Sequence, residues 1–107
     1  MDASKYTYRV MWSEEDKEFV GLCSEFPSLS WLSKSQSAAL AGIRRVVKDV
    51  LRDLKKSKAT IPAPLSLQDF SGKFVVRVPP EIHRKLTMEA AEAGVSLNRV
   101  VSQKLAS

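Results

Sequence analysis

The first 34 residues alternate short apolar runs with polar breaks. The run YTYRVMW alternates at a period of two and is rich in aromatic and β-branched residues, which is typical of a strand. The polar stretch SEEDKE predicts a turn, and the apolar runs FVGLCSEF and LSWLS follow it closely. This spacing favours a three-strand antiparallel meander, with Phe26 and Trp31 helping to fill its core.

Residues 37–57 follow a different period. Apolar side chains recur at steps of three and four, which predicts one long amphipathic helix that can cover a face of the meander. Ser35 or Ser37 is a suitable N-cap, and the lysines at the far end complement the helix dipole. The expected apolar stripe consists of Leu40, Ile43, Val47, Val50, Leu51 and Leu54.

A proline-containing stretch separates this pattern from the C-terminal third of the chain. Residues 59–72 hold two prolines and several small polar side chains without a helical period, so we expect an extended linker. The domain boundary falls here, with one domain over residues 1–58 and a second over 73–107.

The stretch KFVVRVPP changes from alternation to a double proline, which predicts a strand over residues 73–78 and then a helix. Gly94 is expected to end that helix, and Ser96 to cap a second one. The C-terminal unit is therefore strand, helix, turn and helix. Pleating places Phe74, Val76 and Val78 on one face of the strand and Lys73, Val75 and Arg77 on the other.

The predicted strand needs a partner, because so small a unit can neither bury its apolar face nor satisfy the backbone of a lone strand. Pairing with the same strand of a second chain predicts an obligate homodimer. One alternative is that residues 73–78 complete the N-terminal sheet as a fourth strand, which leaves the last two helices as a docking module. The expected dimer core consists of Phe74, Val76, Val78, Ile82, Leu86, Val100 and Val101.

The net charge of +5 is unevenly distributed. Residues 1–34 hold four basic and six acidic side chains, whereas residues 35–58 hold seven and two. A basic excess makes an anionic partner such as nucleic acid plausible. On the helix 37–57, however, Asp49 and Asp53 are expected to pair with cations such as Arg45 on a solvated surface, so we expect no binding site there.

No catalytic constellation emerges from the sequence. A metal-dependent nuclease needs carboxylates that converge on its cations, whereas the N-terminal acids crowd into one turn. His83 lies beside two basic residues, which favours a surface or phosphate-side role over general-base chemistry. Cys23 is expected to be a buried small hydrophobe. We therefore expect no enzyme, metal or cofactor.

The sequence also bears on the compartment. The single cysteine allows no disulfide within the chain, and the start MDASKYTYRV lacks the features of a secretory signal. No apolar run is long enough to span a membrane. A cytoplasmic protein without a membrane partner is the expectation.

The C-terminal stretch GKFVVRVPPEIHRKLTMEAAEAGVSLNRVVSQKL resembles a ribbon-helix-helix DNA-binding domain, whose paired strands enter the major groove. The stretches YTYRVMWSEEDKEFVGLCSEFPSLSW, SAALAGIRRVVKDVL and IPAP resemble the N-terminal domain of HicB-type antitoxins of bacterial toxin–antitoxin pairs. The resemblance implies an α+β fold, with a β-β-β-α partial ribonuclease-H-like domain that lacks catalytic activity. It further implies that this domain blocks a HicA-like mRNA-cleaving toxin, while the C-terminal domain represses the operon.

Three sets of residues are candidates for these contacts. For double-stranded operator DNA, the strand is expected to contact base edges through Lys73, Val75 and Arg77. The start of the last helix offers the backbone N–H groups of Ser96, Leu97 and Asn98 to phosphate, and the side chains of Asn98 and Arg99 can add contacts. A toxin that holds RNA must be basic, which favours the acidic turn of Glu14, Glu15, Asp16 and Glu18, with Glu25 and Trp31 as further candidates.

Purely structural interpretations of these candidate residues stay open. Lys73 and Arg77 would also serve to keep a strand edge soluble, and the acidic turn would also serve as a solvated loop. The alternative function is a protein interaction module that does not bind DNA. Assembly of dimers into a higher oligomer is a further possibility.

Overall fold

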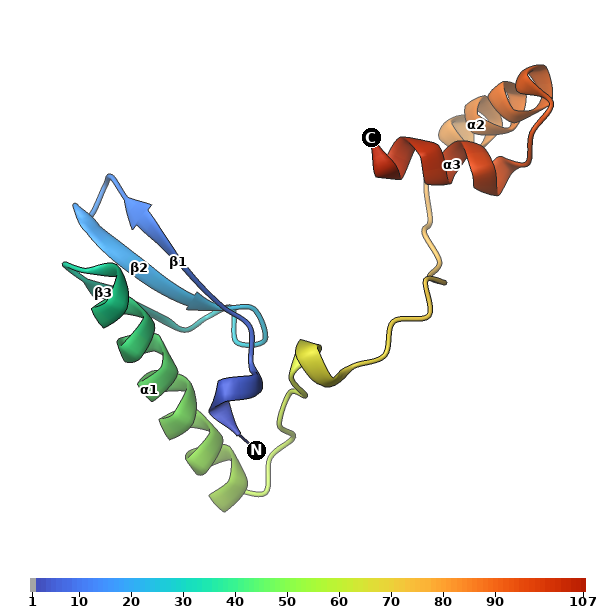
Figure 1. The fold of residues 1–107 in the computed structure, drawn as a ribbon. Coiled ribbons are helices and arrows are strands. Elements are labelled where there is room, and N and C mark those ends of the chain that lie inside the picture. Colours follow the sequence, from blue (N-terminus) through green and yellow to red (C-terminus); the bar gives the residue numbers. More distant parts are fainter. Residues whose placement is uncertain (1) are drawn as a thin grey trace. The chain divides into compact units, whose positions relative to one another are not determined.

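The computed structural model describes residues 2–107 and divides them into two compact units, which meet between Phe70 and Ser71. The chain is of the α+β class, with a three-stranded sheet followed by three helices (Figure 1). In chain order the elements are η1 (Ala3–Lys5), β1 (Tyr8–Ser13), β2 (Glu18–Cys23), β3 (Ser30–Ser33), α1 (Gln36–Lys56), η2 (Leu65–Leu67), α2 (Pro80–Ala93) and α3 (Leu97–Ala106).

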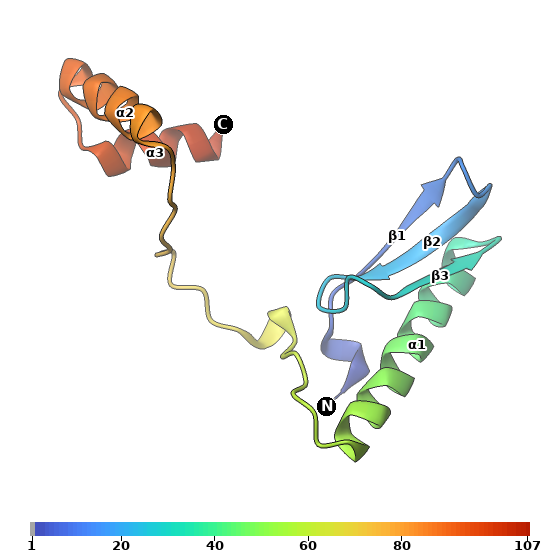
Figure 2. The ribbon, with the colours of Figure 1, turned by 180° about the vertical axis from the view of Figure 1, so that it is seen from behind.

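The first unit is the predicted antiparallel meander with a helix on one face. The strands pair in the order β1-β2-β3, and Gly21 lies opposite Val10 on one side and Trp31 on the other. Helix α1 covers one face of the sheet, as both ribbon views show (Figure 2), and its Ala39 and Ile43 lie against Gly21. A Cβ at Gly21 would lie 2.5 Å from the carbonyl oxygen of Ala39, so this close approach of helix and strand requires glycine.

The core lies between α1 and the sheet. Helix α1 begins after Ser35, whose hydroxyl accepts a hydrogen bond from the N–H of Ala38, so Ser35 and not Ser37 is the N-cap. Of the expected stripe, Ile43, Val47 and Leu51 are buried, Val50 and Leu54 are half-buried, and Leu40 is exposed. The buried cluster consists of Tyr6, Cys23, Phe26, Ile43, Val47 and Leu51.

Phe26 is part of this core as expected, but the same prediction for Trp31 is wrong. The Trp31 side chain is 41% exposed. A Cβ built on Gly42 would lie only 2.0 Å from Cδ1 of Trp31, so the indole rests directly on the backbone of α1. Because the backbone of α1 lies beneath one side of the ring, the other side stays open to solvent and Trp31 is not part of the buried cluster.

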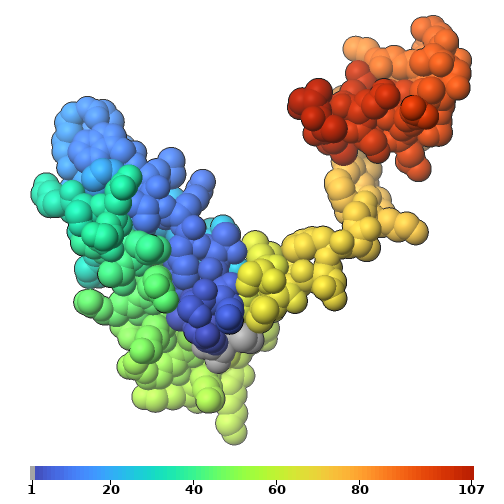
Figure 3. Space-filling view, viewed as in Figure 1, coloured from blue at the N-terminus to red at the C-terminus, as the bar shows by residue number. Residues whose placement is uncertain are grey.

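Part of the expected linker packs on the first unit. The hydroxyl of Tyr6 donates to the carbonyl of Pro62 at 2.6 Å, and the hydroxyl of Ser66 donates to the carbonyl of Lys5 at 2.5 Å. Pro64 is fully buried. Figure 3 shows this yellow segment against the blue N-terminal residues. The first unit therefore extends to Phe70 and does not end at residue 58, because apolar and proline side chains of this segment pack against it.

The second unit contains α2 and α3 as the sequence predicts. Helix α2 begins at Pro80 and ends at Gly94, whose φ of 68° is the left-handed conformation that favours glycine. The N–H of Gly94 donates to the carbonyls of Ala90 and Ala91. Ala90 and Val100 are buried where the two helices pack together.

Residues 73–78, expected as a strand, form no strand in the described chain. Within the described part of the protein, no hydrogen bond is formed by the backbone of residues 74–78. The sheet of the first unit has three strands in residues 2–107, and residues 73–78 are not among them. A β-strand is stabilised by hydrogen bonds to a paired neighbour, and no described residue supplies such bonds to residues 74–78.

Candidate nucleic-acid and partner interfaces

The segment before α2 exposes an unusual amount of apolar surface. Phe74 is 73% exposed and Val76 is 60% exposed, and Val78 and Ile82 are exposed to a smaller extent, at 42% and 46%. Of the other residues expected in a dimer core, Val100 is buried between the helices, and Leu86 and Val101 are half-buried. Contiguous apolar surface of this kind usually marks a contact site. Within the second unit, Phe74, Val76, Val78 and Ile82 are therefore left exposed.

The three candidate base-reading residues lie in the same segment. Lys73, Val75 and Arg77 are all exposed, with Val75 at 89%. Neither of the two cations takes part in an ion pair with another described residue. Their side chains are therefore free to contact an external anion, although their common face depends on strand pairing.

The start of α3 is built as a capped helix end. Ser96 Oγ accepts a hydrogen bond from the N–H of Arg99 at 3.1 Å, which confirms Ser96 as the N-cap. That N–H is thus occupied, so Arg99 could reach a phosphate only through its side chain. The N–H groups of Leu97 and Asn98 remain without an acceptor in the described chain. The N–H groups of Leu97 and Asn98 and the side chain of Arg99 therefore stay candidates for phosphate contact.

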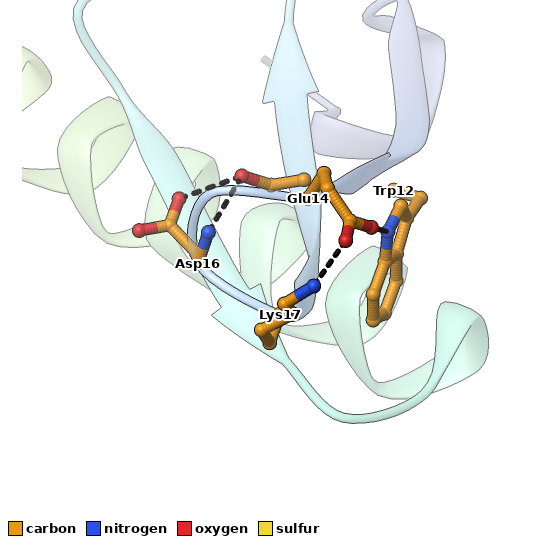
Figure 4. Close-up of polar contacts among 5 residues, drawn as sticks. Trp12, Glu14, Asp16 and Lys17 are labelled. Atoms are coloured by element: carbon orange, nitrogen blue, oxygen red, sulfur yellow. Dashed lines mark hydrogen bonds and ion pairs between the residues drawn. The ribbon is translucent and has the colours of Figure 1, made fainter.

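The acidic turn between β1 and β2 is stabilised by its own contacts (Figure 4). Glu14 forms an ion pair with Lys17 and accepts a hydrogen bond from Nε1 of Trp12 at 2.7 Å. The Lys17 ammonium, and then the indole N–H, lower the pKa of the Glu14 carboxyl below its ordinary value. Lys17 has a positive φ of 55°, which turns the chain here. Much of the charge of Glu14 is therefore offset within the turn.

The other acidic candidates for the toxin contact differ in how far neighbouring groups already engage their carboxylates. Asp16 accepts a hydrogen bond from the hydroxyl of Ser13 at 2.8 Å, and Glu18 pairs with Lys34 at 3.3 Å. Glu15 is exposed and forms no such contact among the residues described. The turn is thus a partly neutralised surface on which Glu15 and Asp16 retain the most available charge.

Glu25 joins two distant parts of the first unit. Its carboxylate accepts hydrogen bonds from the N–H and hydroxyl of Thr7 and, at 2.8 Å, from the N–H of Leu65. Burial by itself would raise the pKa of the Glu25 carboxyl. The hydrogen bonds from the N–H groups of Leu65 and Thr7 outweigh burial, so the net effect is a pKa below the ordinary value. Glu25 was a candidate for the toxin contact, but its carboxylate is engaged inside the unit. We call this set of contacts the Glu25 clasp.

The basic side chains of α1 are less neutralised than the sequence indicated. Asp49 pairs with Arg52 at 3.5 Å, which is the one ion pair of α1 in the described chain. The expected pair of Asp49 with Arg45 is not formed, so that prediction is wrong. A carboxylate at this position reaches only one of its cationic neighbours. Sequence spacing identifies which pairs are possible, but it does not show which pair forms.

The remaining candidate groups lie in ordinary settings. Cys23 is buried at 2% exposure, and burial raises the pKa of its thiol, which confirms it as a small core residue. His83 is on the surface, as expected. Across residues 2–107 no cluster of three or more potential metal ligands is present. None of the helices described has the length and apolar character needed to cross a membrane.

Comparison with known proteins identifies one similarity. Residues 59–105 match the family model of the HicB family. This match supports membership of that family, and it covers the segment held by the Glu25 clasp together with α2 and most of α3. No curated protein and no solved structure matches the chain. Because the match begins at residue 59, the resemblance of residues 1–58 to HicB-type antitoxins stays a prediction.

Proposed function

We propose that this protein is an antitoxin of the HicB type, which neutralises a HicA-like mRNA-cleaving toxin and represses its own operon. The HicB family match over residues 59–105 suggests the antitoxin role and a toxin as one partner. The resemblance of residues 1–58 to the toxin-binding domain of such antitoxins supports the same conclusion. The protein acts by binding and performs no catalysis.

The exposed apolar face before α2 is the observation that carries the DNA-binding half of this proposal. Two copies that pair residues 73–78 as antiparallel strands satisfy both backbones and bury Phe74, Val76 and Val78 against the helices. The opposite face of the resulting ribbon then presents Lys73, Val75 and Arg77 outward. A two-stranded ribbon fits the major groove, where such side chains contact base edges.

The test of repression uses the full chain and two duplexes of equal length. One duplex carries the DNA directly upstream of the gene for this protein, and the other carries the same bases in shuffled order. We expect tighter binding to the upstream duplex, with a steep decrease in affinity as salt rises. Equal affinity for the two duplexes would contradict a role as a sequence-specific repressor.

The test of neutralisation needs the open reading frame next to this gene. If that frame encodes a small RNA-cleaving protein, its cleavage of an mRNA should stop when this protein is added in equal amount. A neighbouring RNA-cleaving protein that remains fully active in the mixture would contradict the antitoxin role.

A further inference from the structure

Helix α1 has a strongly basic outer face. At about 100° per residue, six cations fall within an arc of about 120°, on the side away from Ile43 and Val47. They extend over about 18 Å of helix, and all of them are exposed. We call this face the basic stripe. It consists of Arg44, Arg45, Lys48, Arg52, Lys55 and Lys56.

The charge of the basic stripe is mostly uncompensated. Over its length α1 carries six basic and two acidic residues, and only Arg52 takes part in an ion pair within the described chain. Helix α2 has two basic and three acidic residues besides His83, which is the mixed pattern usual for a solvated surface. Like charges on neighbouring turns repel one another, so the stripe is destabilising unless an anion lies against it.

Several partners are excluded by the structure around the stripe. The apolar side of α1 is buried against the sheet, so the helix cannot insert into a membrane as amphipathic helices do. An RNA-binding toxin must itself be basic and would be repelled. Single-stranded nucleic acid is usually held by stacking of successive bases on aromatic side chains. Helix α1 contains none, and Trp31 lies over Gly42, on the buried side of the helix.

We propose that the basic stripe binds the phosphate backbone of double-stranded DNA without regard to sequence. Cations four residues apart on α1 are separated by about 6 Å, and a duplex carries one negative charge per about 1.7 Å of its axis. A straight row of cations can therefore contact several phosphates along one groove. The side chains of the stripe are long cations, which contact phosphates more readily than they distinguish bases.

The role of this contact rests on the proposed function. When the ribbon of a dimer is bound at its operator, each first unit is held near the flanking DNA by the chain that follows the Glu25 clasp. This tethering raises the effective concentration of the stripe at the duplex, so even weak phosphate contacts add to affinity. The stripe thus extends the protected region beyond the bases that the ribbon contacts.

The experiment compares two triple variants of the full chain on a mixed-sequence duplex. The stripe variant carries Arg44→Gln, Lys48→Gln and Lys55→Gln. The control variant carries Lys5→Gln, Arg9→Gln and Lys34→Gln, which remove the same charge from other exposed positions of the first unit. Binding is measured by fluorescence anisotropy over a series of salt concentrations, and circular dichroism checks that both variants are folded.

We expect the stripe variant to lose affinity for the duplex, and its slope of log affinity against log salt to become shallower by about two to three. The control variant should resemble the parent. Equal losses in the two variants would overturn the proposal, because net charge alone would then account for binding. A larger loss on single-stranded DNA or on duplex RNA than on duplex DNA would also overturn it.

The two proposals can fail separately in this design. Preference for the upstream duplex that survives in the stripe variant, with an unchanged salt slope, leaves the repressor role intact and removes the stripe. Stripe-dependent binding without preference for the upstream duplex supports the stripe and contradicts the repressor.

Discussion

The carboxylate of Glu25 accepts hydrogen bonds from the N–H groups of Thr7 and Leu65. It thereby links the segment of residues 61–67 to the start of the first unit. These hydrogen bonds are made to the ionised form, which explains why the pKa is lowered despite partial burial. A group whose pKa is lower in the folded state adds stability above its unfolded pKa. That stability is lost as the pH falls through the lowered folded value.

Glu25→Gln should therefore destabilise the first unit at neutral pH and flatten its pH dependence in acid. The ordinary glutamate pKa is 4.5, so the difference from the parent should shrink as the pH falls below that value. Thermal unfolding measured from neutral pH to about pH 3 checks this. Glu15→Gln is the matched control, since Glu15 is exposed and should behave like the parent. A Glu25→Gln protein with the pH profile of the parent would contradict the clasp.

Arg77→Ala tests the proposed base contact at the level of one side chain. If Arg77 donates to a guanine edge, its loss should cost about 1–3 kcal/mol on the upstream duplex and relax the preference over shuffled DNA. Lys104→Ala is the control, because Lys104 pairs with Glu89 between α2 and α3. Binding is measured at one fixed salt concentration. A loss of equal size on both duplexes would assign Arg77 to phosphate instead.

At the scale of elements, the helices were predictable because each is bounded by a residue with a local mechanism. Ser35 and Ser96 cap the helices that follow them, and Gly94 ends α2 in the left-handed conformation. These signals act within four residues, so the sequence alone contains them. Strand β1 starts at Tyr8, two residues later than its alternation indicated, because Tyr6 is drawn into the core and bonds Pro62.

The segment of residues 59–70 could not be placed from the sequence. Its composition is that of a linker, and proline-rich chains are extended in water. What holds it is a set of contacts across sequence separations of 40 residues and more, from Tyr6, Glu25 and Lys5. Local patterns contain no information about such contacts. The same holds for Trp31, whose position depends on the space above Gly42.

Val76→Lys tests whether the segment before α2 is a paired strand. In the single chain Val76 is 60% exposed, so a lysine there would cost little unless a second copy covers it. In the proposed dimer the charge would be buried, which is costly for a domain of ordinary stability. We therefore expect loss of the dimer in analytical ultracentrifugation, together with a lower melting temperature.

Val75→Lys is the matched control for this experiment. Val75 is 89% exposed and lies on the opposite face of the proposed strand, so this variant should remain dimeric. A Val76→Lys protein that stays dimeric and folded would contradict pairing through residues 73–78. Dissociation of both variants alike would indicate that any charge in the segment is disruptive.

At the scale of the whole molecule, the charge distribution suits a basic protein partner at the N-terminal end and DNA at the basic parts of the chain. The first 34 residues are net acidic, whereas α1 and the C-terminal third are basic. The sequence predicted this polarity, because the charge of each segment can be counted without knowledge of the fold. It overestimated the acidic turn, however, since the ion pairs of Glu14 and Glu18 offset two of its four carboxylates.

Reversing Glu15 and Asp16 to lysine should slow association with an RNA-cleaving partner and weaken its dependence on salt. Binding of the upstream duplex should not decrease. Stopped-flow mixing at low ionic strength measures the association rate, and Glu14→Gln is a control whose smaller effect follows from its pairing with Lys17. An unchanged rate would move the contact to the sheet face away from α1, where Met11 and Leu32 are exposed.

Both tryptophans of the protein lie in the first unit, and residues 71–107 contain neither tryptophan nor tyrosine. Trp31 rests on α1 and Trp12 packs edge-on against Phe19, so the emission of both indoles depends on the fold of the first unit alone. Fluorescence should therefore follow the melting of that unit, while far-ultraviolet circular dichroism follows all three helices. In a dilution series, a fluorescence transition that stays fixed while a second dichroism transition shifts with protein concentration would assign self-association to the second unit without any mutation.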